Sequence, residues 1–341
     1  MIDVKFVVDG ITLTVSLNDY SSMTIKSHPH DYDVVFEKHP IKFNDGDVVL
    51  IDANVKKLYN IQHSREIIVD AIEENKSIDT VLMVCTKLLD YKFDKGNKLY
   101  VIGGGIIQDI GAFTAKIYKR GVNWIYVPTT LLSQCDSCIG GKTALNFNNY
   151  KNQLALFSAP SKVIIDTTFT KTLSKHDIIS GYGEIVKLFI IGGDTFVNQL
   201  SDISLEKAIM YSLAIKKAVV EYDEFEFNIR KVLNYGHTFG HAVEALSNYE
   251  IPHGQAILYG IELINRLYTK SEKITELVAR YVDLSVLDGF NGVELTKAIL
   301  TDKKVSNGVV SFVVTELGTT NFILSKVDDS LIKSVHEAIV N

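Results

Sequence analysis

The sequence predicts an α/β fold in which an N-terminal, Rossmann-like domain with a parallel sheet precedes a C-terminal, mainly α-helical domain. The chain has 341 residues, which is enough for two domains with cores of their own. Its first half alternates short apolar, β-rich runs with helical stretches, whereas the apolar residues recur at helical spacing after about Leu173. We therefore expect domains at 1–173 and 174–341, with the boundary near Lys171–His176.

The β-rich runs of the first half define the expected sheet. They are continuous in apolar character, which is typical of strands that are buried on both faces of a parallel sheet. A stretch with helical periodicity, from about Ile61 to Leu89, separates the first two runs. The four runs are Asp47–Val55, Lys98–Gly105, Asn123–Thr130 and Lys162–Thr168.

Glycines at the end of the second run indicate a phosphate-binding turn. The segment "KLYVIGGGIIQDIGAF" places Gly103–Gly105 after a strand and before a helix, where the backbone can approach a pyrophosphate. Asp52 ends the first run and is suitably placed to accept hydrogen bonds from ribose hydroxyls. Thr129 and Thr130 end the third run. Because ligands of parallel sheets bind at the carboxyl ends of the strands, these residues predict a nucleotide site.

In the second half, three long stretches have helical spacing. They are "DIISGYGEIVKLFII", "LEKAIMYSLAIKKAVVEYDEF" and "IRKVLNYGHTFGHAVEALSN", and Gly308–Glu316 is a single late β-rich run. We expect the cleft between the two domains to be the active site.

The composition excludes several classes of protein. Hydrophobic residues make up 46% of the chain and charged residues 22%, as in ordinary globular proteins. No apolar run approaches the length of about 18 residues that a membrane span needs, and the first residues lack the layout of a signal peptide. We expect a cytoplasmic protein. The net charge of −6 argues against nucleic acid as the main partner, so an anionic substrate would need cations gathered locally.

The stretch "SQCDSCIGGKTALN" combines a C-x-x-C with Gly-Gly-Lys-Thr, and the two halves suggest different functions. A zinc site would need a second cysteine pair, but the chain has three cysteines in all. A thioredoxin-like motif would lead into a helix rather than into two glycines. We interpret Cys135 and Cys138 as small buried thiols.

A polar stripe is the strongest sign of chemistry in the second half. Arg230, Asn234, His237 and His241 are spaced by four, three and four residues, so one helix would present them on one face. Such a stripe is costly to bury unless it binds something. A solvated polar face is the alternative, but the surrounding sequence is apolar and rich in glycine.

Two further segments offer metal-ligating side chains. His253 lies in "IPHGQA", and Glu184 and Lys187 lie one helical turn apart in "SGYGEIVK". Neutral imidazoles with one carboxylate suit a divalent metal such as zinc. Spacing alone leaves open which two of the three histidines would bind it.

Basic residues lie in or beside the motif segments of this acidic chain. Any one of them taken alone is equally well explained as an ordinary residue on the surface. Together they indicate an anionic, phosphorylated substrate. A metal, a dinucleotide and an anion pocket imply an oxidoreductase step on a phosphorylated polyol. The basic residues are Arg120, Lys142, Lys151, Lys187, Lys216 and Arg230.

From about Asp47 to Gly318 the chain resembles the 3-dehydroquinate synthase family of sugar-phosphate cyclases. In this resemblance the "SQCDSCIGGKTALN" loop matches a segment in which Asp136 and Lys142 matter, and the two cysteines merely flank Asp136. The matching motifs, in the family order, are "GGGIIQD", "YKRG", "PTTLLSQCDSCIGGKTALN", "KN" at Lys151–Asn152, "IDTTFTKTL", "SGYGEIVK", "DEFEFNIRKVLNYGHTFGHAVEA", "HGQA" and "DKK".

The resemblance implies NAD as cofactor and zinc, or another divalent metal such as cobalt, with Glu184, His237 and His253 as its ligands. His241 is then an acid/base and phosphate contact. Arg120 matches an arginine that reaches across the interface of a homodimer. The implied NAD contacts are Asp52, Asn54, Glu73, Lys76, Gly104, Gly105, Asp109, Thr129, Thr130, Asp136, Lys142, Lys151 and Thr172. The implied substrate contacts are Lys142, Asn152, Lys187, Lys216, Arg230, Asn234 and either Lys303 or Lys304.

The implied reaction converts 3-deoxy-arabino-heptulosonate 7-phosphate into 3-dehydroquinate and phosphate. It proceeds by transient oxidation with NAD, β-elimination of phosphate, re-reduction and intramolecular aldol closure. Ile72, Gln108 and Tyr150 stand where the family usually has glycine, which leaves room for a relative that uses another sugar phosphate in a cyclitol pathway. Two less favoured hypotheses are a metal-dependent polyol dehydrogenase and a non-catalytic binding protein.

Overall fold

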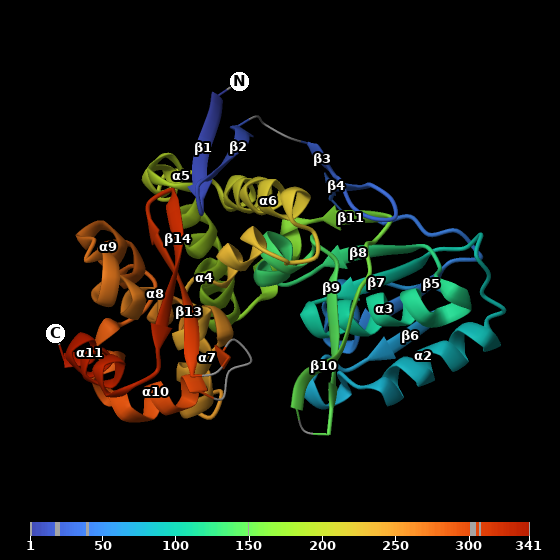
Figure 1. Ribbon diagram of the computed structural model, residues 1–341. Coiled ribbons are helices and arrows are strands. Elements are labelled where there is room, and N and C mark those ends of the chain that lie inside the picture. The colour runs from blue at the N-terminus through green and yellow to red at the C-terminus, as the bar shows by residue number, and fades with distance from the viewer. Residues whose placement is uncertain are drawn as a thin grey trace. The chain divides into compact units, whose positions relative to one another are not determined.

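The computed structural model describes residues 2–17, 21–38, 41–148, 150–300, 305–306 and 308–340. Contacts along the chain divide it into two compact units. We call residues 19–174 the α/β unit, and residues 1–18 together with 175–341 the helical unit. Figure 1 shows the elements of each.

A seven-stranded sheet forms the centre of the α/β unit, in the order β3-β4-β11-β8-β7-β5-β6. All neighbouring strands are parallel except β3 and β4, so the predicted parallel sheet is confirmed. The strands are β3 (Ser22–Ile25), β4 (Tyr32–Phe36), β5 (Val48–Asp52), β6 (Glu66–Val69), β7 (Leu99–Gly103), β8 (Trp124–Pro128) and β11 (Lys162–Ile165).

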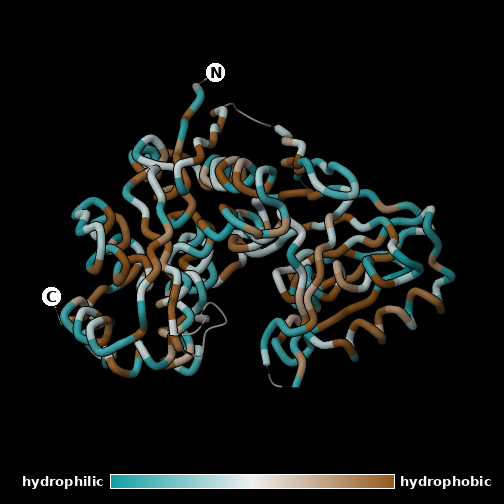
Figure 2. Tube along the Cα trace, viewed as in Figure 1, coloured by the Kyte–Doolittle hydropathy of each residue, from teal (hydrophilic) through white to brown (hydrophobic). Residues whose placement is uncertain are grey.

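Both faces of the central strands β5, β7 and β8 are buried, as continuous apolar strands require. One face packs Ile51 and Ile102 in a cluster with Val55 of α1 (Ala53–Tyr59). On the other face Val101 packs against α3 (Gly105–Ile117). This helix comes so close that a Cβ at Gly111 would lie 2.4 Å from Cγ2 of Val101. Helix α2 (Ile78–Asp90) packs against α3. In Figure 2 hydrophobic residues run through the strands, and hydrophilic ones dominate many of the loops.

The expected helical stretch from Ile61 to Leu89 is wrong in its first part. Residues Glu66–Val69 form β6, an edge strand that pairs in parallel with β5. The helix begins only after Ser77, whose side chain caps it by accepting the backbone N–H of Thr80. Four residues at a sheet edge carry too little periodicity to reveal a strand, so tertiary pairing decides their conformation.

A hairpin that the sequence analysis did not predict follows β8. Strands β9 (Lys142–Phe147) and β10 (Tyr150–Phe157) pair antiparallel as a separate two-stranded sheet. They carry Lys142, Lys151 and Asn152. Short helices complete this unit: η1 (Glu73–Asn75), η2 (Tyr118–Arg120), η3 (Ser133–Ser137) and η4 (Thr167–Thr172).

The helical unit contains a five-stranded sheet in the order β12-β13-β14-β1-β2. Only β13 corresponds to the late β-rich run that the sequence predicted. The first residues of the chain form β1, which pairs in parallel with β14 near the C-terminus (Figure 1). The strands are β1 (Ile2–Val8), β2 (Ile11–Leu17), β12 (Val305–Ser306), β13 (Val309–Glu316) and β14 (Thr319–Lys326).

This pairing changes the expected grouping of the chain. The sequence predicts one domain over residues 1–173, but residues 1–18 group with the second half of the chain. A change in hydrophobic spacing along the sequence cannot reveal that a strand joins a sheet formed by residues roughly 300 positions away. The assignment of cofactor binding to one domain and of metal binding to the other stays a prediction.

Helices make up the rest of the helical unit. Among them, α8 packs against α7 and α4, and α4 also packs against α6. None of the helices described is long and apolar enough to cross a membrane. The helices are α4 (Lys175–Gly192), α5 (Asp194–Gln199), α6 (Leu205–Tyr222), η5 (Ile229–Asn234), α7 (His237–Leu246), α8 (His253–Ile264), η6 (Asn265–Thr269), α9 (Glu272–Ala279), η7 (Leu284–Gly289), α10 (Gly292–Leu300) and α11 (Asp329–Val340).

The polar stripe from Arg230 to His241 does not lie on one helix. The 3-10 helix η5 ends at Asn234, and α7 begins at His237. Between them Gly236 adopts φ 75°, a left-handed conformation that favours glycine. A Cβ at Gly236 would also lie 2.8 Å from the carbonyl oxygen of Ile257 in α8. The glycine therefore breaks the helix and lets α8 approach.

Candidate active site

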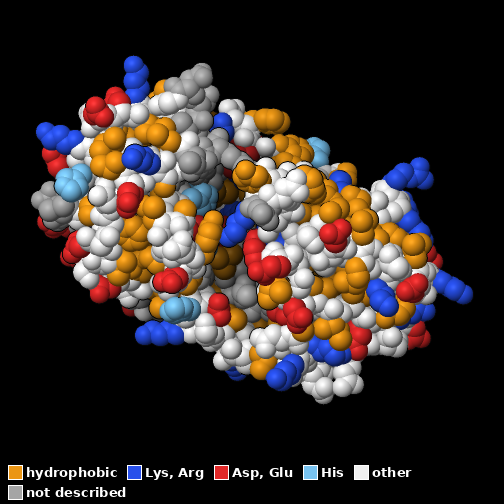
Figure 3. Space-filling model, turned by 90° about the horizontal axis from the view of Figure 1, so that it is seen from below, with side chains coloured by type: hydrophobic (Ala, Val, Ile, Leu, Met, Phe, Trp, Pro, Cys, Tyr) orange, Lys and Arg blue, Asp and Glu red, His pale blue; other side chains and the backbone are white. Residues whose placement is uncertain are grey.

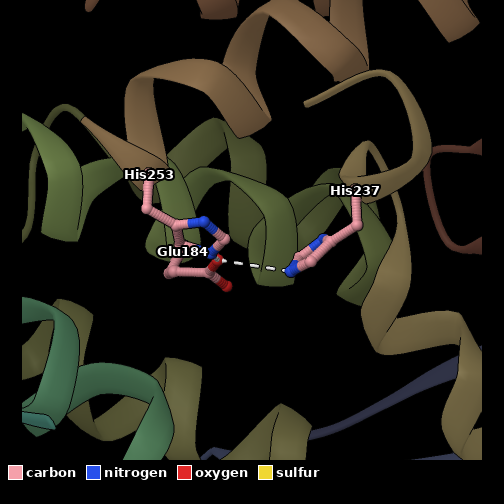
Figure 4. A group of neighbouring side chains, drawn as sticks. All are labelled: Glu184, His237 and His253. Carbon is pink, nitrogen blue, oxygen red and sulfur yellow. Dashed lines mark ion pairs between the residues drawn. The ribbon is translucent and has the colours of Figure 1, made fainter. Parts of the chain in front are cut away.

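Three side chains of the helical unit point toward one another (Figure 4). Glu184 comes from α4, His237 begins α7 and His253 begins α8. One donor atom from each lies within 4.8 Å of the other two. The Oε1 atom of Glu184 is 3.4 Å from Nε2 of His253 and 3.8 Å from Nε2 of His237. One carboxylate and two imidazoles form a donor set that suits zinc or cobalt.

The backbone brings Glu184 and His253 together. Their neighbours Gly183 and Gly254 lie where α4 and α8 touch, and a Cβ at Gly254 would be 1.8 Å from the carbonyl oxygen of Ser180. No other residue type fits at such a distance, so the two helices meet backbone to backbone. Residues next to this contact project into the same small volume.

Charge at this group favours a cation. Glu184 is 1% exposed and forms an ion pair with Lys187, one turn along α4. Burial lowers the pKa of His253, but hydrogen bonds to Glu184 and Glu244 and their negative charges outweigh it and raise the pKa to about 9. Two carboxylates thus stabilise positive charge at His253, and a bound divalent cation would supply such charge.

His241 lies close to the same group. Its ring centroid is 5.4 Å from that of His237 and 6.0 Å from that of His253. With Glu244 and His253, the exposed His241 also makes a second set of side chains that could hold a metal. All three histidines that the sequence singled out are therefore neighbours. Glu244, which the sequence analysis did not single out, joins them from α7.

Basic side chains are buried in the same unit. Lys187, Lys216 and Arg230 are 2%, 6% and 2% exposed, on α4, α6 and η5. These elements contact one another. Lys187 pairs with Glu184, and three cationic side chains in adjoining elements make this part of the helical unit rich in positive charge, which suits an anionic ligand. On the face shown in Figure 3, surface acids and bases lie interspersed.

The loop before η5 holds Arg230 in place. The carboxylate of Asp223 accepts the backbone N–H groups of Phe227, Asn228 and Arg230, at 2.9, 2.7 and 3.1 Å. The Arg230 guanidinium donates to the carbonyl oxygen of Glu224. Asp223 was not predicted, and only its position seven residues before Arg230 could have pointed to it. Asn234 donates to Glu226, and Lys303 and Lys304 lie outside the described residues.

In the α/β unit, several predicted NAD contacts lie at the carboxyl ends of β5, β7 and β8. Asp52 ends β5 and caps α1 by accepting the N–H of Asn54 at 3.0 Å. Burial is the main reason that the pKa of Asp52 is raised. Gly104 precedes α3, and a Cβ there would lie 2.9 Å from Cγ2 of Thr130, two residues beyond the end of β8. The N–H of Thr129 donates to Gly103.

This edge is where the order of the sheet reverses. From β5 the chain continues to β6 on one side and then returns to β7 on the other side. Parallel sheets bind ligands at such a switch point, outside the carboxyl ends of the strands. Gly105 and Asp52 flank it. The nucleotide site that the sequence predicts therefore lies at the place that the topology favours.

A polar network joins the hairpin to this edge. Lys76 bridges Asp109 on α3 and Asn152 on β10, at 2.6 and 2.7 Å. Asn146 on β9 donates to the carboxylate of Glu73 at 2.8 Å. Burial outweighs the charge of Lys76 and raises the pKa of Asp109. Four residues of this network, Glu73, Lys76, Asp109 and Asn152, are predicted ligand contacts, and each has a partner within the network.

The remaining predicted residues of the α/β unit lie outside the network around Lys76. Thr172 meets the hydroxyl of Tyr59 at 2.8 Å, and Asp136 lies in η3 between the buried Cys135 and Cys138. The prediction that both cysteines are buried thiols is thus confirmed. Lys142 and Lys151 are exposed on the hairpin.

Arg120 ends η2 in a left-handed conformation with φ 65°. It is exposed and lines a cavity of about 310 Å³ together with His30, Lys95 and Lys116.

Comparison with known proteins shows the family of the chain. Residues 66–180 match the family model described as 3-dehydroquinate synthase N-terminal, and residues 181–305 match 3-dehydroquinate synthase C-terminal. The chain belongs to the 3-dehydroquinate synthase family. A 3-dehydroquinate synthase of Alkaliphilus metalliredigens (strain QYMF) is 34% identical over 79% of this chain and 83% of its own length. One of Pelagibacter ubique (strain HTCC1062) is 42% identical over 60% of each chain.

Solved structures with the same fold include other cyclases. A 2-deoxy-scyllo-inosose synthase complexed with carbaglucose-6-phosphate, NAD⁺ and Co²⁺ has a TM-score of 0.78 at 19% identity, over 93% of this chain and 99% of that one. A 2-epi-5-epi-valiolone synthase from Streptomyces hygroscopicus with NAD⁺ and Zn²⁺ has a TM-score of 0.75 at 21% identity, over 92% and 98%. A probable glycerol dehydrogenase from Sinorhizobium meliloti scores 0.53 at 13% identity, over 86% and 89%.

Proposed function

We propose that the chain is a 3-dehydroquinate synthase, which converts 3-deoxy-arabino-heptulosonate 7-phosphate into 3-dehydroquinate and phosphate. The enzyme acts in the cytoplasm, in the biosynthesis of aromatic amino acids. One observation carries the proposal: α4 places a buried metal-ligating carboxylate, Glu184, one turn from a buried lysine, Lys187. A metal centre beside buried cations is suited to a substrate that has both hydroxyl and anionic groups, and a simple polyol would not need the cations.

Glu184, His237 and His253 hold the metal, zinc or cobalt. Their donor atoms already lie within 4.8 Å of one another, and two carboxylates favour positive charge at His253. A metal held there would lower the free-energy cost of forming an alkoxide on a substrate hydroxyl. NAD held at its own site would supply reversible hydride transfer with the substrate.

The NAD site is the switch-point edge of the parallel sheet. The glycines before α3 admit the pyrophosphate, and Asp52 accepts the ribose hydroxyls. The residues proposed to contact NAD are Asp52, Asn54, Glu73, Lys76, Gly104, Gly105, Asp109, Thr129, Thr130, Asp136, Lys142, Lys151 and Thr172.

Buried basic residues orient the substrate. Arg230 binds its carboxylate, because a planar guanidinium can donate two parallel hydrogen bonds to that group. His241 exchanges a proton near the phosphate, which departs by β-elimination. The other substrate contacts are Lys142, Asn152, Lys187, Lys216, Asn234 and one of Lys303 and Lys304.

The enzyme acts as a homodimer in which Arg120 reaches the partner's active site. Its exposure on a left-handed turn supports this role. The test mixes two inactive variants, Arg120→Ala and His253→Ala, under conditions that exchange subunits. A mixed dimer then contains one site with an intact metal group and an arginine from its partner, so activity should return. A stable mixed dimer without activity would show that Arg120 serves its own chain.

The function itself is tested by incubating the full chain, loaded with zinc and a catalytic amount of NAD, with 3-deoxy-arabino-heptulosonate 7-phosphate. We expect phosphate release and formation of 3-dehydroquinate, identified by mass and NMR, over many turnovers per NAD. If protein that retains both cofactors releases no phosphate, the substrate is another sugar phosphate, and hexose 6-phosphates should be tried next. Tyr150, 69% exposed at the start of β10, would then be the first residue to replace with glycine.

A further inference from the structure

Glu244 is the one acidic side chain of α7, and it contacts a proposed metal ligand from outside the proposed ligand group. Its Oε2 atom lies 3.2 Å from Nδ1 of His253, and its side chain is 15% exposed. The other ring nitrogen of His253, Nε2, faces Oε1 of Glu184 at 3.4 Å. His253 therefore lies between two carboxylates, one at each nitrogen.

The two nitrogens of a neutral imidazole have different roles. One carries the proton and donates, and the other offers the lone pair that a metal needs. A carboxylate can only accept, so when His253 binds a metal as a neutral imidazole, Glu244 keeps the proton on Nδ1 and the lone pair falls on Nε2. This lone pair points to the side where Glu184 lies. The position of Glu244 thus selects the tautomer of His253 that can bind a metal there.

His237 shows the same arrangement with a different acceptor. Its Nδ1 lies 3.1 Å from the backbone carbonyl oxygen of Tyr235, and its Nε2 faces Glu184 at 3.8 Å. Both histidines therefore have Nδ1 held by an acceptor and Nε2 turned to the same carboxylate. Only at His253 is the acceptor a side chain, so only there can it be changed by mutation.

We propose that Glu244 is a positioning residue for the metal: it fixes the orientation and tautomer of His253 and strengthens it as a ligand. This inference rests on the metal site of the proposed function. Groups that accept the second N–H of a ligating histidine typically contribute about 10- to 100-fold to metal affinity. The chain's own geometry assigns that task to Glu244 at His253 and to the backbone at His237.

A competing role for Glu244 is direct ligation. With His241 and His253 it forms the second group whose donor atoms lie within 4.8 Å. A metal held by the nearest atoms of the two side chains, Oε2 of Glu244 and Nδ1 of His253, would displace the hydrogen bond between them. The two roles predict different stoichiometries, because a ligand of a second position would add a second metal ion per chain.

The experiment measures metal affinity directly on the full-length protein, stripped of metal and titrated with Co²⁺ or Zn²⁺ against a chromophoric chelator. We expect one metal per chain and a dissociation constant raised about 10- to 100-fold in Glu244→Ala. Glu244→Gln should lose less, because its amide oxygen still accepts the Nδ1 proton but lacks the charge. The visible spectrum of bound Co²⁺ should keep its intensity, since the ligands are unchanged.

Matched controls separate this role from a merely structural one. Glu250→Gln removes the same charge from the exposed segment between α7 and α8 and should leave the affinity unchanged. The metal-free Glu244→Gln protein should unfold at the temperature of the metal-free wild type. Wild-type affinity in both Glu244 variants would overturn the inference, and so would loss of a second metal with the first unaffected. If His253→Ala also kept its affinity, the ligand assignment of the proposed function would fail as well.

Discussion

His253 is the residue on which the metal group depends most clearly, because both of its ring nitrogens face carboxylates. His253→Ala would leave one histidine and Glu184, and a zinc site with two protein ligands is poor. We expect the variant to lose its metal and nearly all turnover, measured by metal analysis after desalting and by phosphate release. His176→Ala, at the exposed start of α4, is the control and should keep both. Full activity of metal-free His253→Ala would refute the assignment.

Asp223 governs the loop that presents Arg230. Burial opposes its ionisation, but backbone N–H groups of Arg230, Asn228 and Phe227 outweigh it, and the pKa of Asp223 lies below its ordinary value. Asp223→Asn keeps one acceptor oxygen and removes the charge. We expect KM for the substrate to rise about tenfold, with unchanged metal content, because Arg230 would be held less firmly. Unchanged KM would mean that the loop does not need this carboxylate.

The lowered pKa of Asp223 also makes the stability of the protein depend on pH. A carboxylate whose pKa is depressed by folding stabilises the native state at pH values above its unfolded pKa, about 3.9. That contribution is lost as the pH falls through the lower folded value. The difference in free energy of unfolding between wild type and Asp223→Asn should therefore be constant from about pH 7 to about pH 5 and shrink below about pH 4. Denaturant titrations at several pH values would check this.

At the scale of elements, the contact between α4 and α8 sets the distance between two of the proposed ligands. A methyl group at Gly254 would lie 1.8 Å from the Ser180 carbonyl oxygen, so Gly254→Ala must push the helices apart. We expect a loss of at least about 1–3 kcal/mol in stability and a weaker metal site. Gly289→Ala is the matched control, since nothing lies within 4 Å of a Cβ there. Thermal unfolding and chelator competition report the two effects.

Some elements could be predicted from the sequence and others could not, for physical reasons. The strands β5, β7 and β8 are continuous apolar runs bounded by turn residues, so their burial in a parallel sheet follows from local pattern. The hairpin β9–β10 is only partly apolar, and two residues far earlier in the chain hold it: Lys76 donates to Asn152, and Glu73 accepts from Asn146. Gly236 breaks a helix that spacing alone would have continued. Such outcomes depend on partners that are distant in sequence.

The residues of the site, like the elements of the fold, could be predicted from the sequence only in part. The donor types, Glu184 with histidines, and the glycines after β7 can be read from composition and spacing. The choice between histidines needed the family resemblance, and the structure then grouped His237 and His253 with Glu184. Glu244 and Asp223 escaped notice because each acts through another residue. No motif marks a side chain whose role is to hold a neighbour.

At the scale of the molecule, the N-terminal strand should matter to the helical unit and not to the α/β unit. Phe6 of β1 is 1% exposed, whereas the adjacent Lys5 is exposed on the other face. Phe6→Ala should lower the free energy of unfolding by about 3–5 kcal/mol. Lys5→Ala should change it by no more than about 0.5 kcal/mol. Hydrogen exchange read by mass spectrometry should show faster exchange in residues 175–340 and unchanged protection in the α/β unit. An equal increase in hydrogen exchange in both units would contradict the division of the chain into these two units.

The parallel pairing of β1 with β14 also has a consequence for synthesis on the ribosome. Val7 and Val8 find their partners Thr319 and Thr320 only near the end of the chain. At about 5–20 residues per second, roughly 300 residues take about 15–60 s to make. During that time the α/β unit can complete its own sheet, while β1 has emerged with one edge unpaired. Until β14 has been made, the nascent chain therefore carries an aggregation-prone strand, and we expect a chaperone to shield it during that time.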